Sequence, residues 1–186
     1  MSQKKYLLEL IRNQNFAELK EILVQQITSP TNTFFDSSEN YSDCDIAYNN
    51  CKEQWKKYGS KYQVSNLGRI KYKTTNFVIP QININQNLYL DKQKWKEKCY
   101  KFSINTIKIS SYTKIYYEYI ASTWLEEEKE AAKEGFKTMF KKNPKSRLEI
   151  HHINNCENDN RVDNLIYLNS YFHNEIHKIA KANRIN

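Results

Sequence analysis

The chain has 186 residues, enough for one domain of ordinary size or two small ones. Its hydrophobic content of 39% is modest, but the 13% of aromatic residues allows a core because aromatic side chains bury large areas. The formal net charge is +8, the four cysteines include no C-x-x-C pair that would indicate a zinc ribbon, and no apolar run is long enough for a signal peptide or a membrane span.

The positive charge is concentrated in the middle of the chain. Residues 1–50, 51–125 and 126–186 carry net charges of −3, +10 and +1. A basic segment of this kind is typical of proteins with a polyanionic partner, most often a nucleic acid, although scattered solvated lysines give the same total. We expect an intracellular protein with free thiols, in the cytoplasm of a bacterial host or in the nucleus or an infected cell of a eukaryote.

The N-terminal part of the chain has a helical pattern. Apolar residues recur at three- and four-residue steps over residues 4–27, and Asn13 and Asn15 are candidates to divide this helix in two. We therefore expect an N-terminal helical segment over 1–30, followed by a polar linker over 31–50. The segment either docks on the main body or forms a separate element for partner binding.

The basic middle of the chain, residues 51–114, is expected to be a β-rich module. Val64 and Ile70 lie on short predicted strands around the turn sequence SNLG, and apolar and polar residues alternate in several later segments. Residues 115–142 are then predicted to be helical, and Asn143-Pro144 marks the end of the helix.

The C-terminal part reads as strand, loop, strand and helix. LEIHHI and NLIYL are the strands, NNCENDNRVD is the loop between them, and SYFHNEIHKIAKAN is a helix with Asn169 or Ser170 as N-cap. This unit is too small for a core of its own, so we expect a bound metal to contribute to its stability. It also contains every histidine of the chain.

The spacing of these four histidines indicates a metal site. His173 and His177 lie four residues apart on one helix face, whereas the neighbours His151 and His152 point to opposite sides of a strand. A consistent assignment gives three ligands and one free histidine that serves as a general base. The alternatives are a closed structural site with Cys156 or His152 as fourth ligand, or histidines scattered on the surface.

The motif over residues 148–178 resembles the HNH endonucleases, whose catalytic unit is a ββα-metal, or His-Me, finger. The segments that carry the resemblance are H-H-I-N-N, N-R-V-D-N-L and H-x-x-x-H. By resemblance, His151, His173 and His177 bind the metal and His152 activates water. Asn164 is then the middle Asn of the motif, which bridges the loop and helps to orient the base.

A second resemblance lies upstream, between Trp55 and Lys73. The sequence WKKYGSKYQVSNLGRIKYK is similar to a short DNA-binding module with the form W…Y-x-V-S-N-x-G-R that precedes HNH domains in phage homing-type nucleases. Gly68 is expected to adopt a backbone shape that a β-carbon would forbid. The residues expected to contact DNA are Asn66, Arg69, Lys71, Lys73 and, in the later loop, Arg161. An ordinary hairpin with a solvated basic face is the alternative.

The expected fold is α+β: an N-terminal helical segment, a short basic β-rich region and a C-terminal ββα-metal unit within an HNH domain over 115–186. The expected function is hydrolysis of phosphodiester bonds in double-stranded DNA by a phage- or virus-type homing enzyme, with neither a membrane nor a small-molecule cofactor involved. Mg²⁺ is the expected ion, and Zn²⁺, Ni²⁺, Co²⁺ or Mn²⁺ are alternatives. A non-catalytic DNA-binding protein with a structural metal finger, a non-specific toxin or defence nuclease and an RNA substrate remain open, as does the oligomeric state.

Overall fold

The computed structural model describes residues 2–28, 53–79, 115–155 and 159–183, which form a mixed α+β structure. The expected linker over 31–50 and the strands expected between 80 and 114 lie outside these residues. None of the described helices combines the length and the apolar character needed to cross a bilayer.

The N-terminal segment consists of two helices, α1 (Gln3–Arg12) and α2 (Phe16–Thr28). The Ser2 side chain accepts a hydrogen bond from the amide of Lys5 and so caps α1. Asn13 ends the helix, and Gln14 then takes the left-handed conformation with φ of 55°. The predicted division of this helix in two is therefore confirmed.

The described part of the basic segment, residues 53–79, forms a four-stranded antiparallel sheet in the order β1-β2-β3-β4. Its strands are β1 (Trp55–Tyr58), β2 (Tyr62–Ser65), β3 (Ile70–Tyr72) and β4 (Val78–Ile79). The predicted SNLG turn joins β2 to β3, and Gly68 within it has a φ of 79°. This is a conformation that favours glycine, as expected.

Three helices and a hairpin follow. The helices are α5 (Ile115–Trp124), α6 (Glu126–Gly135) and α7 (Lys137–Lys142), which ends before Asn143-Pro144 as predicted. The antiparallel strands β5 (Leu148–His152) and β6 (Leu165–Asn169) are joined by a loop that contains the short 3-10 helix η3 (Val162–Asn164). Helix α8 (Ser170–Asn183) comes last, and the Asn169 side chain accepts a hydrogen bond from the amide of Tyr171 at its start.

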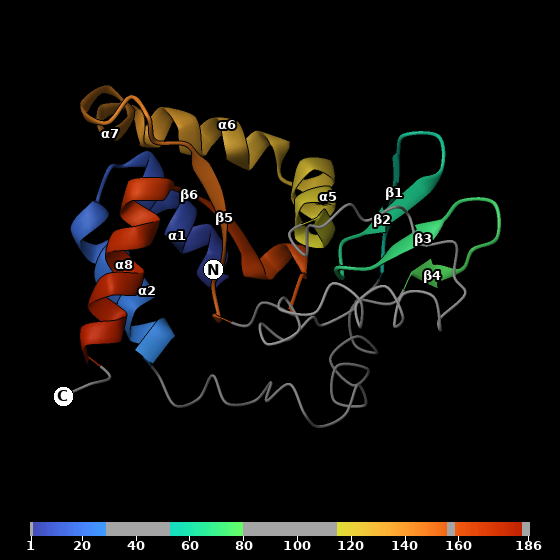
Figure 1. Ribbon diagram of the computed structural model, residues 1–186, viewed down its shortest axis with the longest axis horizontal. Coiled ribbons are helices and arrows are strands. Elements are labelled where there is room, and N and C mark those ends of the chain that lie inside the picture. Colours follow the sequence, from blue (N-terminus) through green and yellow to red (C-terminus); the bar gives the residue numbers. More distant parts are fainter. Residues whose placement is uncertain (1, 29–52, 80–114, 156–158, 184–186) are drawn as a thin grey trace, which may run out of the picture.

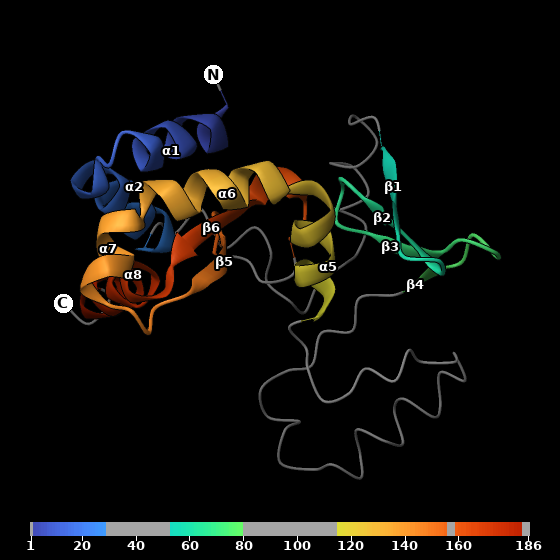
Figure 2. The same cartoon turned by 90° about the horizontal axis from the view of Figure 1, so that it is seen from above.

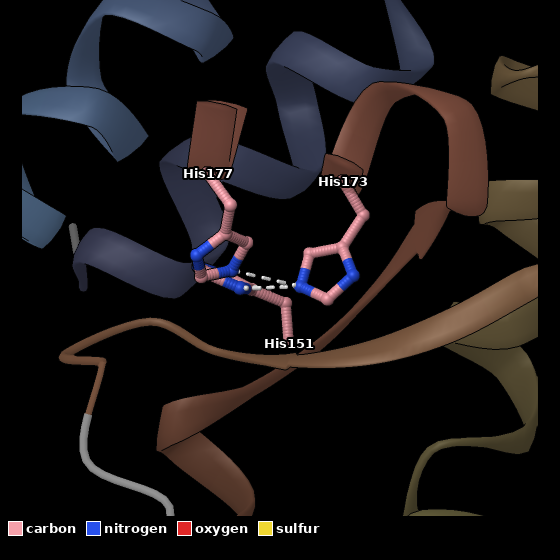
Figure 3. A group of neighbouring side chains, drawn as sticks. All are labelled: His151, His173 and His177. Atoms are coloured by element: carbon pink, nitrogen blue, oxygen red, sulfur yellow. Dashed lines mark hydrogen bonds between the residues drawn. The ribbon is translucent and has the colours of Figure 1, made fainter. Parts of the chain in front are cut away.

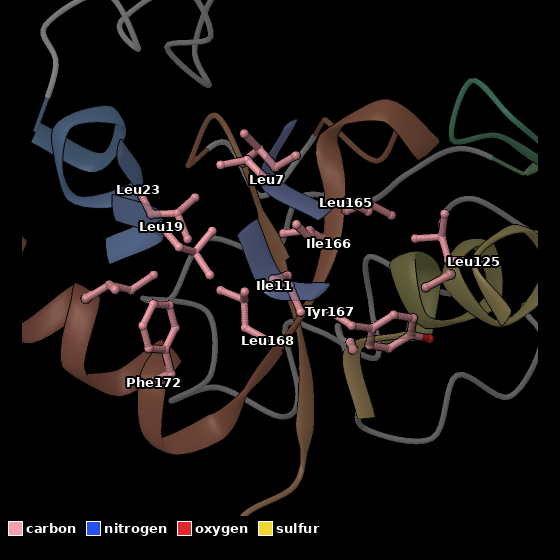
Figure 4. Close-up of a cluster of buried hydrophobic side chains, with 14 of the residues drawn as sticks. Leu7, Ile11, Leu19, Leu23, Leu125, Leu165, Ile166, Tyr167, Leu168 and Phe172 are labelled. Atoms are coloured by element: carbon pink, nitrogen blue, oxygen red, sulfur yellow. The ribbon is translucent and has the colours of Figure 1, made fainter. Parts of the chain in front are cut away.

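The N-terminal helices complete the core of the C-terminal part. Helix α1 lies against α6, and α2 lies against α8 (Figures 1 and 2). The Phe16 ring stacks on Phe136 with centroids 5.0 Å apart, and both rings contact Phe172. Figure 4 shows this core, to which α1, α2, β6 and α8 all contribute side chains. The docked alternative for the N-terminal segment is therefore the one observed.

The four-stranded sheet lies at the opposite end of the structure from α8, beside α5 (Figure 1). The indole Nε1 of Trp124 on α5 donates to the Val64 carbonyl at 3.1 Å. The amide of Val162, in the loop between β5 and β6, donates to the Asn66 carbonyl at 2.9 Å. The SNLG turn thus contacts the loop that follows the His-His strand.

Candidate metal centre

Strand β5 and helix α8 bring three of the four histidines together. His151 comes from β5, while His173 and His177 come from successive turns of α8 (Figure 3). Each offers one ring nitrogen, and these three atoms lie within 4.8 Å of one another. The predicted group of three histidines is therefore assembled, which excludes scattered surface histidines.

The distances between the ring nitrogens are compatible with binding of one shared metal ion. Nε2 of His173 lies 3.1 Å from Nδ1 of His151 and 3.1 Å from Nε2 of His177. Two nitrogens that bind one tetrahedral zinc ion at its usual bond length are separated by about 3.3 Å. Two of the three separations are therefore close to this value, and the third pair, His151 and His177, lies within 4.8 Å.

The environment of His151 favours the neutral imidazole that metal binding requires. The residue is 2% exposed, and its Nε2 atom has no hydrogen-bond partner within the described parts of the chain. Burial, with the charges of His173, His177 and His152, lowers the pKa of His151 well below its ordinary value. Its ring is thus uncharged at neutral pH and ready to act as a ligand.

Glu149 is a functional candidate that the histidine pattern alone did not identify. Its Oε2 atom lies 3.0 Å from Nδ1 of His173, so the carboxylate accepts that N–H and leaves the Nε2 lone pair of His173 facing the cluster. Burial alone would raise the pKa of Glu149, but its contacts with His173 and Arg147 outweigh this and lower it. A signal was present in the sequence, because residues two apart on a strand share a face and Glu149 precedes His151 by two.

His152 lies apart from this group, as the strand alternation predicted. It is 8% exposed, and its Nε2 atom lies 2.8 Å from Oδ1 of Asn160. The ring of Tyr117 on α5 makes an edge contact with it at a centroid distance of 5.4 Å. Since an amide oxygen only accepts, this contact assigns the imidazole hydrogen to Nε2 and makes Nδ1 the basic nitrogen.

Asn164 bridges the loop between β5 and β6. Its Nδ2 atom donates to Oδ1 of Asn154 at 2.8 Å and to the carbonyl of Asp159 at 2.7 Å, and its Oδ1 accepts from the amide of Asn154 at 3.0 Å. The Asn164 carbonyl also accepts from the amide of Ile153, directly after the two histidines. None of these bonds joins Asn164 to His152, so Asn164 holds the loop that follows His152 without contacting its ring through them.

Two of the residues predicted to contact DNA lie on one face of the sheet. Lys71 Nζ and the Arg69 guanidinium lie over the Trp55 ring, at 4.2 and 5.9 Å from its centroid. Arg69 also forms a two-pronged ion pair with Glu53. Lys73 is exposed just beyond β3. A phosphate at this face would have to compete with Glu53 for Arg69.

The other two predicted DNA contacts have structural partners. Oδ1 of Asn66 accepts from the amide of Gln54 at 2.7 Å. Arg161 donates to both carboxylate oxygens of the buried Asp159, at 2.7 and 2.6 Å. Contacts of either residue with nucleic acid stay a prediction.

Within the described residues, the cluster offers three ligand atoms for a metal ion. Its three ligand atoms come from His151, His173 and His177, and His152 does not belong to the group. Cys156, the other candidate for a fourth ligand, lies outside the described residues. Three neutral imidazoles leave an ion with most of its charge and with coordination positions for a substrate and water. Comparison of the chain with protein-family models, with curated proteins and with solved structures finds no match.

Proposed function

We propose that the chain is a metal-dependent endonuclease of the HNH type that hydrolyses phosphodiester bonds in DNA. In this proposal the unit β5–β6–α8 is a ββα-metal finger, and the basic sheet β1–β4 binds the nucleic acid. The motif over residues 148–178 and the arrangement of its side chains both support the assignment.

One observation carries the proposal. Three imidazole nitrogens converge on one point, while the sequence neighbour of one of them, His152, is oriented separately by an amide. A structural metal site has no need of a fourth imidazole with one nitrogen fixed as donor and the other as base. Metal-assisted hydrolysis of a phosphodiester by a general base uses both a site for a cation and a basic side chain.

In this reaction each of the following side chains would have a separate role. Nδ1 of His152 takes a proton from a water molecule as its oxygen attacks phosphorus, and the bond from phosphorus to the 3′ oxygen breaks. The leaving oxygen then takes a proton from solvent. Glu149 fixes the ring of His173, and Asn164 fixes the loop that follows the base.

The donor set fits a divalent ion. His151, His173 and His177 would hold it, and it would supply Lewis-acid stabilisation of the charge that develops on the phosphate and the leaving oxygen. Imidazole ligands favour Zn²⁺, Ni²⁺ or Co²⁺, whereas Mg²⁺ is the ion we expect to support cleavage in the cell.

The test is cleavage of supercoiled plasmid by the purified chain with Mg²⁺, Mn²⁺, Ni²⁺ or Zn²⁺ and with EDTA. We expect metal-dependent nicking or linearisation. His152→Ala should reduce the rate by about 10²- to 10⁴-fold while DNA binding in a gel shift persists. Asn174→Ala, an exposed change on the same helix as two of the ligands, is the matched control and should cleave normally.

The products discriminate between the remaining functions. One recurring cut site in a genomic library supports a homing enzyme, and cleavage of any plasmid supports a toxin or defence nuclease. Cleavage of RNA but not of DNA would show that RNA is the substrate. Binding without cleavage of either plasmid or library DNA under all four metals would contradict the proposal and favour a DNA-binding protein with a structural metal finger.

A further inference from the structure

We propose that Asn160 is the positioning residue for His152, and that the SNLG turn of the basic sheet fixes Asn160 by direct backbone contact. The part of the chain that would bind nucleic acid would thereby set the orientation of the base. This inference rests on the proposed nuclease function for its catalytic consequence, but the geometry itself is independent of it.

The first step is the contact between Asn160 and His152. Asn160 is 2% exposed, and its Oδ1 atom lies 2.8 Å from Nε2 of His152. A buried amide oxygen at this distance stabilises the tautomer with hydrogen on Nε2 and restricts rotation of the ring. Rotation or the other tautomer would turn an N–H toward the water that the base has to deprotonate.

The second step is the contact between the SNLG turn and Asn160. A β-carbon added to Gly68 would lie 2.6 Å from the carbonyl carbon of Asn160 and 2.7 Å from its oxygen. The turn therefore packs against the backbone of Asn160 with no room for a methyl group. The neighbouring hydrogen bond from the Val162 amide to the Asn66 carbonyl, 2.9 Å long, joins the same two segments.

The third step is the attachment of the sheet to the body. Trp124 Nε1 donates to the carbonyl of Val64, one residue before the turn begins. The turn leads directly into β3, and Arg69 before the strand and Lys71 within it share the face over Trp55. A displacement of this sheet is transmitted to Asn160 without an intervening side chain.

Two glycines of the sheet provide a matched test. Gly68 and Gly59 have φ values of 79° and 57°, so alanine is strained at both positions, but a β-carbon at Gly59 has nothing within 4 Å. In Gly68→Ala we expect loss of the single Nε2–H tautomer of His152, and a 10- to 100-fold lower kcat with DNA affinity changed less than threefold. Gly59→Ala should retain the wild-type tautomer and kcat.

The tautomer is measured by long-range ¹H–¹⁵N spectra of the imidazole nitrogens at pH 8.5, with His152 assigned by its loss in His152→Ala. Asn160→Ala should produce the same change as Gly68→Ala. Asn160→Asp retains an oxygen acceptor and should restore the Nε2–H tautomer and most of kcat. If Gly68→Ala does not fold, Trp124→Phe removes the bond to Val64 and should shift the tautomer populations in the same direction.

The spectra separate this proposal from the proposed function. A wild-type Nε2–H tautomer that is lost in Gly68→Ala and retained in Gly59→Ala supports the positioning even if no substrate is cleaved. The proposal is overturned if wild-type His152 carries its hydrogen on Nδ1, or if its tautomer is unchanged in both Asn160→Ala and Gly68→Ala. An equal loss of kcat in Gly59→Ala and Gly68→Ala would overturn the catalytic part.

Discussion

Single residues around the cluster determine how well it can bind an ion, and Glu149 is the first of them. Its carboxylate accepts the Nδ1 hydrogen of His173, which fixes that ring with Nε2 toward the other ligands. Glu149→Gln should weaken metal binding by about 10- to 100-fold, because the amide is a poorer acceptor and can present its NH₂ group instead. Calorimetric titration with Zn²⁺ measures the effect.

Glu134→Gln is the control for this prediction. Glu134 is an exposed residue paired with Lys137, far in sequence from the cluster. The Glu134→Gln substitution should leave the affinity for Zn²⁺ unchanged. Equal affinities for Glu149→Gln and the wild type would show that the contact does not orient a ligand.

The buried His151 should make the metal-free protein sensitive to acid. Its pKa is lowered in the folded chain, whereas in the unfolded chain it stays near 6.5. Between these two values the unfolded chain binds more protons, so the free energy of unfolding falls as pH decreases below 6.5, by up to about 1.4 kcal/mol per pH unit. Urea denaturation at several pH values in EDTA measures this slope.

His151→Gln removes the titrating group and should flatten this part of the pH dependence. Saturating Zn²⁺ should restore stability in the wild type near neutral pH, because an ion that binds only the folded chain adds its binding energy. A wild-type slope that equals that of His151→Gln would contradict the assignment.

At the scale of single residues, the sequence was sufficient to predict which histidines share a face, but it did not predict contacts between residues far apart in the chain. The spacing of His173 and His177 and the strand alternation at His151 and His152 follow from helix and strand periodicity alone. The contact between Gly68 and the backbone of Asn160 joins segments far apart in the chain, and no local periodicity encodes it.

At the scale of elements, the packing of α1 on α6 depends on a glycine. A β-carbon at Gly135 would lie 2.5 Å from the Ile11 carbonyl oxygen and 2.6 Å from its Cγ2 atom. Alanine normally stabilises a helix by about 1 kcal/mol relative to glycine, but here the two helices would have to separate. We expect Gly135→Ala to lower the melting temperature, as followed by circular dichroism.

Ala131→Gly, on the same helix, separates the effect of helix propensity from that of the packing between α1 and α6. It should lower the melting temperature only by the amount that corresponds to the usual free-energy cost of glycine in a helix. A Gly135→Ala protein more stable than the wild type would mean that α1 and α6 are not in such close contact.

The basic sheet leads to a prediction about salt. Lys57 and Lys73 are exposed on it, whereas a phosphate at Arg69 would have to compete with Glu53. The double variant Lys57→Gln/Lys73→Gln should reduce the slope of log affinity against log salt by about 2. Fluorescence anisotropy with a DNA duplex at several salt concentrations measures it.

Lys133→Gln/Lys137→Gln removes the same charge from α6 and α7, where both lysines pair with glutamates. Its salt slope should match that of the wild type. An equal reduction in both double variants would mean that net charge, and not the sheet, governs binding.

Most described elements were predictable from local patterns. The division of the N-terminal helix, the end of α7 before Asn143-Pro144 and the hairpin followed by α8 all follow from periodicity and breakers. What the patterns did not reveal is that α1 and α2 provide the core that the small C-terminal unit lacks. That pairing depends on shape, since any apolar helix face would fit the same pattern.

At the scale of the whole molecule, this shared core should make the N-terminal helices essential for stability. Leu19 on α2 is fully buried within it. Leu19→Ala should lower the free energy of unfolding by about 2–5 kcal/mol and destabilise α8 together with α2. Hydrogen exchange of α8 amides, with the partly buried Leu8→Ala as a milder control, measures this coupling. Unchanged protection in α8 would show that the two helices unfold independently.

Contacts between residues far apart in the chain determine when the fold can be completed during synthesis. Lys4 donates to the carbonyl of Val162 at 2.7 Å, and Lys20 pairs with Glu175 at 2.5 Å, so each bond spans more than 150 residues. At about 5–20 residues per second, a ribosome needs roughly 10–30 s to supply those partners. The N-terminal helices would spend that interval with their apolar faces exposed to chaperones, and the histidine cluster would form only after residue 177 had been added. Under the proposed function, cleavage would therefore begin only after residues 173 and 177 have left the ribosome.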